Sequence, residues 1–112
     1  MAKLTVRELV TQEGRSPYRD WLRGLDIAAR ARIQARVLRF EAGNLGNHKA
    51  VGEGVLEARV MFGPGYRIYF VRDGDHIVLL LLGGDKGTQA RDIQRAQEFW
   101  KNFRETNHGK AK

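Results

Sequence analysis

Apolar positions change their spacing several times along the chain, and each spacing predicts a different element. Residues 3–10 alternate imperfectly between apolar and polar side chains, which predicts a first strand. Ser16 and Pro17 predict a helix start, because serine caps helix N-termini and proline suits the first helical position. We expect this short helix to bury its large apolar residues, namely Tyr18, Trp21, Leu22 and Leu25.

A longer helix is predicted over residues 27–41, with Asp26 as its N-cap. Its apolar stripe has spacings of four, four and three residues and consists of Ala29, Ile33, Val37 and Phe40. The arginines of this helix fall on its flanks and outer side, namely Arg30, Arg32, Arg36 and Arg39. The next segment, residues 43–54, holds four glycines and two asparagines, which predicts a long loop.

Three more strands are predicted over residues 55–62, 66–72 and 76–82, separated by glycine-containing turns typical of hairpins. The run from Ile77 to Leu82 is apolar without alternation. We therefore place that strand in the centre of the sheet, covered on both faces.

A last helix is predicted over residues 88–105, with Thr88 as its N-cap. Its buried stripe would consist of Ala90, Ile93, Ala96, Trp100 and Phe103. The resulting order, β–α–α–β–β–β–α, predicts an α+β domain with a mostly antiparallel four-stranded sheet, a helical hairpin and a C-terminal helix. We expect one domain over residues 1–106, followed by a frayed polar tail over residues 107–112.

Composition narrows the chemistry of this 112-residue chain. Cysteine is absent, which excludes disulfides, thiolate zinc sites and cysteine nucleophiles. His48, His76 and His108 lack the spacing of metal ligands, so we expect no metal site and no cofactor. No apolar run is long enough to span a membrane and no secretory signal is visible, which favours a cytoplasmic protein. The formal net charge of +7 favours a polyanionic partner, either nucleic acid or an acidic protein.

Strand alternation gathers candidate chemistry on one face of the predicted sheet. If the apolar sides of residues 55–62 and 66–72 face the helices, the opposite face carries Glu57, Arg59, Arg67 and Tyr69. A solvated sheet face with a cross-strand Arg–Glu pair would give the same pattern. Further cations and a histidine could converge on the edge of this face, namely His48, Lys49 and Lys86. The arginine-rich helix over 27–41 has three readings: an RNA contact, a docking surface for a partner protein, or a solvated face.

Several short segments then occur in a specific order. They are Ser16-Pro17-Tyr18 with Trp21-Leu22, the Gly43–Asn47 segment, Gly52-Glu53-Gly54 followed by Val55–Arg59, the Gly63–Tyr69 segment, and Leu82-Gly83-Gly84-Asp85-Lys86-Gly87-Thr88-Gln89. In this order they resemble the HigB-like "addiction module killer protein" toxins of the RelE/ParE superfamily. The resemblance covers roughly residues 3–103 and implies a RelE-like fold.

This resemblance implies the toxin of a type II toxin–antitoxin system, a class of small basic proteins held inactive by an acidic or DNA-binding antitoxin. RelE-like members cut messenger RNA on the ribosome. The ribose 2′-hydroxyl is the nucleophile, a cyclic phosphate is left, and no metal is needed. ParE-like members share the fold but poison DNA gyrase without cutting RNA, which is the alternative function. An inactive remnant that only binds antitoxin is a third.

The resemblance also implies roles for individual residues. Arg67 and Lys86 would stabilise charge on the phosphate, with Lys86 as the candidate acid, and Arg59 would contact phosphate. Glu57 or His48 would be the base, and Tyr69 would stack on a nucleobase or donate a proton. RNA-binding positions would be Lys49, Arg59, Arg32, Arg36 and Arg39. The chain departs from RelE itself in having Asp92 about where a tyrosine is expected.

Overall fold

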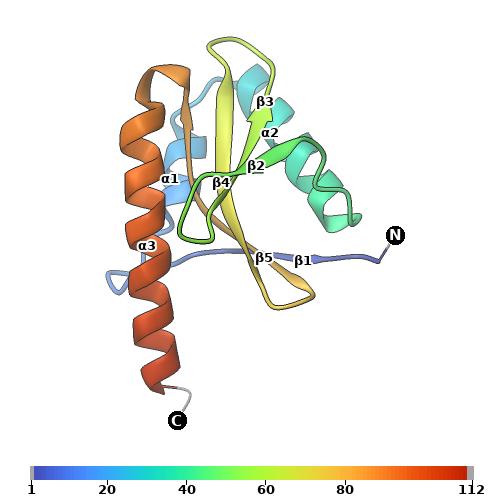
Figure 1. The fold of residues 1–112 in the computed structure, drawn as a ribbon. Helices are drawn as coiled ribbons and strands as arrows, with labels where there is room; N and C mark the ends of the chain where they lie inside the picture. The colour runs from blue at the N-terminus through green and yellow to red at the C-terminus, as the bar shows by residue number, and fades with distance from the viewer. Residues whose placement is uncertain (1, 111–112) are drawn as a thin grey trace.

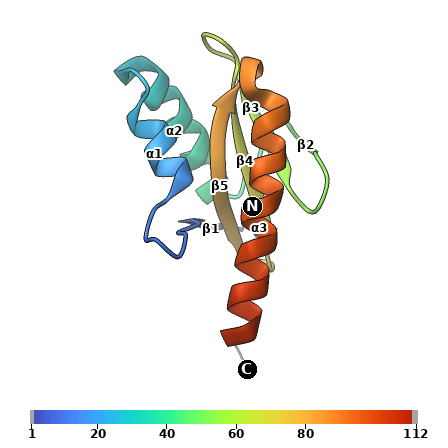
Figure 2. The same cartoon turned by 90° about the vertical axis from the view of Figure 1, so that its left-hand side faces the viewer.

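The computed structural model is a sheet with helices on both faces, α1 and α2 on one and α3 on the other (Figures 1 and 2). It describes residues 2–110, and the side chains of residues 2–106. In chain order the elements are β1 (Thr5–Glu8), α1 (Pro17–Arg23), α2 (Ile27–Glu41), β2 (His48–Ala50), β3 (Leu56–Val60), β4 (Tyr66–Asp73), β5 (Ile77–Asp85), the 3-10 turn η1 (Lys86–Thr88) and α3 (Gln89–Lys110).

The sheet has five strands in the order β1-β5-β4-β3-β2. Neighbouring strands pair antiparallel, except that β1 runs parallel to β5. The α+β class and the mostly antiparallel sheet are confirmed, but the predicted count of four strands is wrong. The additional strand, β2, lies within residues 43–54, which we expected to form a loop. Its three residues are all exposed, so no apolar alternation marks it in the sequence.

The predicted N-caps of α1 and α2, Ser16 and Asp26, are confirmed, and α2 has the predicted bounds. The Asp26 carboxylate accepts a hydrogen bond from the Ala29 amide at 2.9 Å, and the Ser16 hydroxyl accepts one from the Arg19 amide at 3.0 Å. Because a cap depends on residues three positions apart, its signal is local and visible in the sequence.

Two apolar cores lie on the two faces of the sheet. One packs α1 and α2 against β3, β4 and β5, and includes Tyr18, Ile33, Phe40 and Phe70. The other packs α3 against β4 and β5, and includes Val71, Leu81, Ala96 and Trp100. The prediction that β5 is covered on both faces is confirmed, but the central strand is β4, because β2 adds a strand at the far edge.

Gly83 and Gly84 follow the predicted strand over residues 76–82, but in the structure they are part of β5. A Cβ on Gly83 would overlap the Trp21 ring, and a Cβ on Gly84 would overlap the Asp92 carboxylate. These glycines therefore make room for side chains from α1 and α3. Two predicted strands are shorter than expected, since β1 and β3 occupy only the middle of residues 3–10 and 55–62, whereas β4 extends one residue beyond the predicted 66–72.

The start of α3 differs in detail from the prediction. Asp85 caps the preceding turn, with its carboxylate accepting from the Gly87 amide at 2.8 Å, and Thr88 is the last residue of that turn. Ala90 is exposed, contrary to the predicted stripe, because Asp92 is the residue of the first turn that is buried. The helix continues to Lys110, beyond the predicted end, and residues 111–112 of the predicted tail lie outside the described residues.

No helix in the part of the chain that the structure describes is both long enough and apolar enough to cross a membrane.

A polar contact ties the first strand to the first helix. The Ser16 hydroxyl donates to Glu8 Oε1 at 2.8 Å, and the Arg19 guanidinium forms an ion pair with Glu8. Burial alone would raise the pKa of Glu8, but the hydrogen bonds from Arg19 and Ser16 outweigh it and lower the pKa. The charged form of Glu8 therefore stabilises the folded state.

We expect Glu8→Gln to lower the free energy of unfolding by about 1 kcal/mol at neutral pH. A carboxyl whose folded pKa is lowered contributes stability above its unfolded pKa and loses that contribution as pH falls through the folded value. The difference from wild type should thus shrink below about pH 4. Urea unfolding of both proteins at neutral pH and below about pH 4 measures this difference. Glu13→Gln is the control, because Glu13 is exposed. An equal difference at both pH values would contradict it.

Candidate functional site

Two cross-strand rows of polar residues lie on the sheet face that α3 covers. Lys49 of β2, Glu57 of β3 and Tyr69 of β4 are register partners and form the first row. Arg59 and Arg67 are partners in the next row. The expectation that Glu57, Arg59, Arg67 and Tyr69 share one face of the sheet is therefore confirmed. We call these residues, with Lys49, Lys86 and Gln89, the Glu57 cluster.

The Glu57 carboxylate lies at the centre of this cluster, and its side chain has no exposed surface. Its Oε2 accepts hydrogen bonds from the Tyr69 hydroxyl at 3.1 Å and from Gln89 Nε2 at 2.9 Å. Lys49 Nζ lies 3.8 Å from Oε1, and Arg67 Nε lies 3.6 Å from Oε2. A buried carboxylate requires such partners, because an unpaired charge is costly away from water.

Tyr69 is fully buried beneath α3. Burial raises the pKa of its hydroxyl, and the neighbouring Glu57 charge raises the pKa further. The hydroxyl therefore stays protonated at physiological pH and acts as a hydrogen-bond donor to Glu57.

Arg67 and Lys86 lie beside each other at the turn between β3 and β4. Arg67 Nη1 donates to the Gly65 carbonyl at 2.9 Å. Gly65 has φ of +79°, and a Cβ on it would lie 3.6 Å from Arg67 Nη1 and 3.9 Å from Lys86 Cβ. Gly65 thus brings the backbone close to both cationic side chains. The 3-10 turn after β5 holds Lys86 at this place and leaves its side chain exposed.

The structure changes one expectation about this face. The sequence suggested an open patch, but Glu57, Tyr69 and Arg67 are buried, and Lys49, Arg59 and Lys86 are the exposed cations around them. The reason is the N-terminal turn of α3, which closes over the patch and contributes Gln89. Sequence reasoning missed Gln89, although its position after a predicted helix cap would place it near the end of β5.

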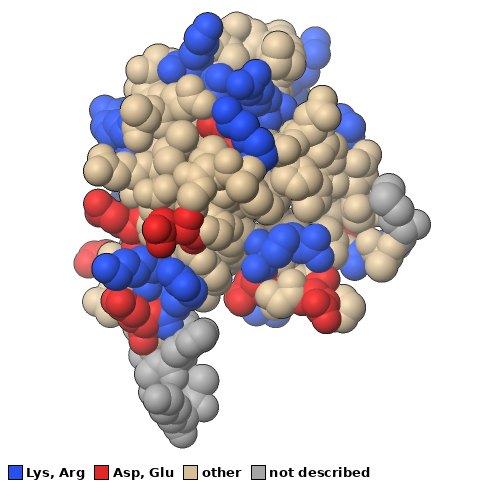
Figure 3. Space-filling view, viewed as in Figure 1, with Lys and Arg blue, Asp and Glu red and all other residues tan. Residues whose placement is uncertain are grey.

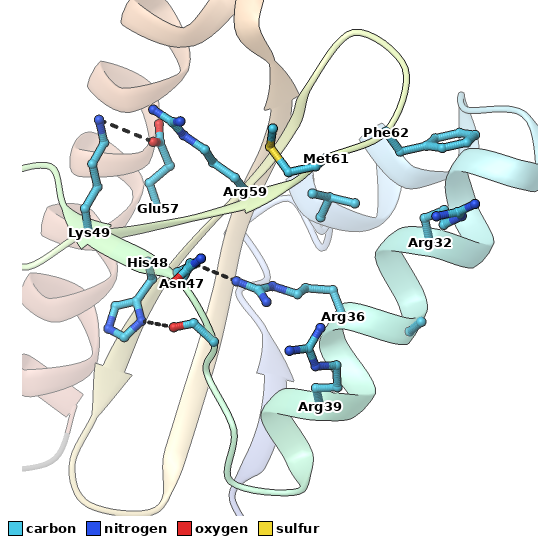
Figure 4. Close-up of a pocket in the computed structure, with 13 residues that line it drawn as sticks. Arg32, Arg36, Arg39, Asn47, His48, Lys49, Glu57, Arg59, Met61 and Phe62 are labelled. Carbon is cyan, nitrogen blue, oxygen red and sulfur yellow. Dashed lines mark hydrogen bonds and ion pairs between the residues drawn. The ribbon is translucent and has the colours of Figure 1, made fainter.

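His48 is separated from the Glu57 cluster. It pairs with Ala58, and adjacent strand residues face opposite ways, so its ring lies on the α2 side of the sheet, 6.0 Å from the ring of Phe70. The exposed ring donates through Nδ1 to the Gly46 carbonyl at 2.9 Å. Figure 4 shows His48 and Lys49 on opposite sides of β2.

A groove of about 1020 Å³ lies between α2 and the edge formed by β2 and β3 (Figure 4). The cationic residues that line it are Arg32, Arg36, Arg39, Lys49 and Arg59, and His48 lines it as well. Arg36 is buried, contrary to the expected outer position, because its guanidinium packs on Gly46 and donates to the Asn47 carbonyl at 2.6 Å. Burial and the nearby Arg39 lower the pKa of Arg36.

Charge is unevenly distributed on the molecular surface. In the view of Figure 3, Lys and Arg dominate the upper half of the face, whereas the lower half mixes both signs. Within the described residues, no three side chains of the His, Cys, Asp and Glu types are grouped so as to hold a metal ion.

Comparison with known proteins identifies the family. Residues 20–101 match the family model of phage-derived Gp49-like proteins (DUF891). The chain belongs to this family. Gp49-like proteins are a RelE/HigB-type toxin family of addiction modules, so the family is associated with toxin–antitoxin systems. The chain is also similar to an uncharacterized protein of Haemophilus influenzae, with 43% identity over 79 residues that cover 70% of this chain and 80% of the relative.

The Gp49-like match includes every residue of the Glu57 cluster, from Lys49 to Gln89. It also includes Asp92. Asp92 is buried, accepts a hydrogen bond from the Thr88 hydroxyl, and packs on Gly84. In this Gp49-like chain the start of α3 is therefore fastened to the end of β5, next to the cluster.

We expect Tyr69→Phe to lower the free energy of unfolding by about 1–3 kcal/mol, because it leaves the buried Glu57 carboxylate with one donor fewer. Urea unfolding measures the change. Tyr66→Phe is the matched control, because Tyr66 is half-buried and no hydrogen bond is found for its hydroxyl among the described residues. Equal losses in the two variants would mean that the Tyr69 hydroxyl does not support Glu57.

Proposed function

We propose that this protein is the toxin of a toxin–antitoxin module and that it cleaves messenger RNA on the ribosome. The observation that carries the proposal is a buried carboxylate beside a group of cations: Arg67 Nε lies 3.6 Å from Glu57 Oε2, Arg59 is the cross-strand partner of Arg67, and Lys86 and Arg67 both lie close to Gly65. Family membership supports the toxin assignment and an antitoxin partner. The net charge of +7 supports a substrate and a ribosomal surface made of phosphates.

The proposed reaction is an internal transesterification of RNA. The 2′-oxygen attacks the adjacent phosphorus, the bond from phosphorus to the 5′-oxygen breaks, and a 2′,3′-cyclic phosphate remains. One group must take the 2′-hydroxyl proton, and another must give a proton to the departing 5′-oxygen. Cations must stabilise the charge that develops on the phosphate oxygens.

Both the exposed cations of the cluster and the buried Arg67 are assigned to the phosphate. Arg59 is assigned to a phosphate contact, and Arg67 to the charge that develops on phosphorus-bound oxygens. An arginine side chain stays protonated, so neither of these residues exchanges protons. Lys86 is assigned to charge stabilisation and to proton donation to the 5′-oxygen, because it is an exposed lysine whose Cβ lies close to Gly65, as Arg67 Nη1 does.

Glu57 is the better placed of the two candidate bases. His48 lies on the other side of the sheet, whereas Glu57 lies among Arg59, Arg67 and Lys49. Glu57 Oε1 is buried and has no hydrogen-bond partner among the described residues, so we assign this oxygen to the 2′-hydroxyl proton. Tyr69 is then a positioning residue, because its buried hydroxyl holds the other oxygen of the same carboxylate.

Induced expression in bacteria with primer extension on a reporter message tests this function. We expect growth arrest with cuts in translated message, and we expect Lys86→Ala to reduce cutting by about a hundredfold or more. Lys101→Ala is the matched control, since Lys101 is exposed on α3 outside the cluster. Thermal unfolding of both variants verifies that each is folded.

Other outcomes would contradict the proposal in distinct ways. Growth arrest with intact message would favour gyrase poisoning of the ParE type. Absence of arrest by the wild-type protein would favour an inactive protein that only binds antitoxin. Unchanged cutting by Lys86→Ala would remove Lys86 from the site.

A further inference from the structure

We propose that the groove between α2 and the β2–β3 edge binds the sugar-phosphate backbone of the RNA strand as it continues beyond the Glu57 cluster. This inference rests on the proposed function for the identity of the ligand. The groove extends beyond the cluster, because Lys49, Glu57 and Arg59 line one end of it and the arginines of α2 line the other (Figure 4).

The first argument is a row of unpaired positive charges. Arg32, Arg36 and Arg39 line the groove, and no carboxylate in the described part of the chain forms an ion pair with any of them. Their spacings of four and three residues place them on one helix face, about 6 and 4.5 Å apart along the axis. Such a row can follow successive phosphates of one strand.

The second argument is the position of Arg36. This side chain is only 8% exposed, its Nη2 donates to the Asn47 carbonyl, and its Nε is buried without a hydrogen-bond partner among the described residues. A buried cation without an anion is costly unless a ligand supplies the negative charge. Glu57 is the acidic residue among the groove's lining residues, and its carboxylate is already enclosed by the cluster.

The third argument is continuity with the cluster. Lys49 and Arg59 belong to the cluster and also line the groove. They stand at the sheet edge, where the outermost strand is only three residues long. A strand that leaves the cluster across β2 would thus pass from these two cations to the arginines of α2.

The groove also offers flat surfaces that favour RNA over an acidic peptide. The Arg32 guanidinium lies over the Phe62 ring, 4.7 Å from its centroid. Met61 is 83% exposed beside it, and the His48 ring is exposed on the other wall. Unpaired bases stack on such aromatic rings and guanidinium planes. The carboxylates of an acidic peptide would pair with the guanidinium charges and would leave these flat surfaces uncovered.

Binding of 2′-O-methylated RNA of two lengths tests the proposal, because these oligonucleotides lack the nucleophilic hydroxyl. We expect the wild-type protein to bind a dodecamer more tightly than a trinucleotide. The double variant Arg32→Ala/Arg39→Ala should weaken dodecamer binding on the order of tenfold to a hundredfold. It should also reduce the slope of log affinity against log salt by about 1.4, since each phosphate contact on a single strand contributes about 0.7.

The matched control is Arg7→Ala/Arg72→Ala, which removes the same charge from exposed positions outside the groove. Fluorescence anisotropy measures all affinities. Equal binding of the two lengths by wild type, or equal losses in the two double variants, would overturn the groove proposal and leave the nuclease function standing. Failure to bind either RNA, together with intact reporter message, would count against the proposed function itself. Equally tight, Arg32- and Arg39-dependent binding of an oligoglutamate would make the groove a peptide site and overturn the RNA assignment.

Discussion

A carboxylate removed from water constrains much of this small protein. Glu57 lies on β3, and its partners come from β2, β4 and the first turn of α3. Each partner lowers the cost of burying the charge, so the four elements are favoured in one arrangement only. The same carboxylate attracts two cations, since Lys49 Nζ lies 3.8 Å from its Oε1 and Arg67 Nε lies 3.6 Å from its Oε2. The contacts of Glu57 therefore hold these elements together and also position the charged groups of the site.

Buried charged side chains have different partners on the two faces of the sheet. On the α3 side, a buried anion gathers cations around itself. On the α2 side, Arg36 is buried against the backbone of residues 46 and 47, and no carboxylate of the described residues forms an ion pair with it. The first face thus holds a buried anion among its cations, whereas the arginines of α2 that line the groove have no ion-pair partner in the described part of the chain. These arginines add unneutralised positive charge beside a three-residue edge strand.

Local signals in the sequence predicted the helices well and the strand edges less well. Ser16 and Asp26 marked both helix starts because capping acts over three residues. Strand alternation also placed Glu57, Arg59, Arg67 and Tyr69 on one face, whereas the pairing of Glu57 with Tyr69 and of Arg59 with Arg67 is known from the structure. In contrast, β2 carried no apolar pattern, and the buried position of Arg36 depends on Gly46, which lies in a segment whose path the sequence does not specify. Closure of α3 over the cluster was likewise a tertiary effect, visible only once Gly84 and Asp92 are seen in contact.

The shortness of β2 has a further consequence for the molecule. His48 and Lys49 are neighbours in the chain, and strand geometry sends one to each side of the sheet. A slip of this strand by a single residue would exchange them, placing an imidazole on the side of Glu57 and an ammonium group on the α2 side of the sheet. Glycines with positive φ stand on both sides of the strand, at Gly46 and Gly52, and give the chain the sharp bends that fix its start and its end. The turns at Gly46 and Gly52 therefore keep His48 on the α2 side of the sheet and Lys49 on the side of Glu57.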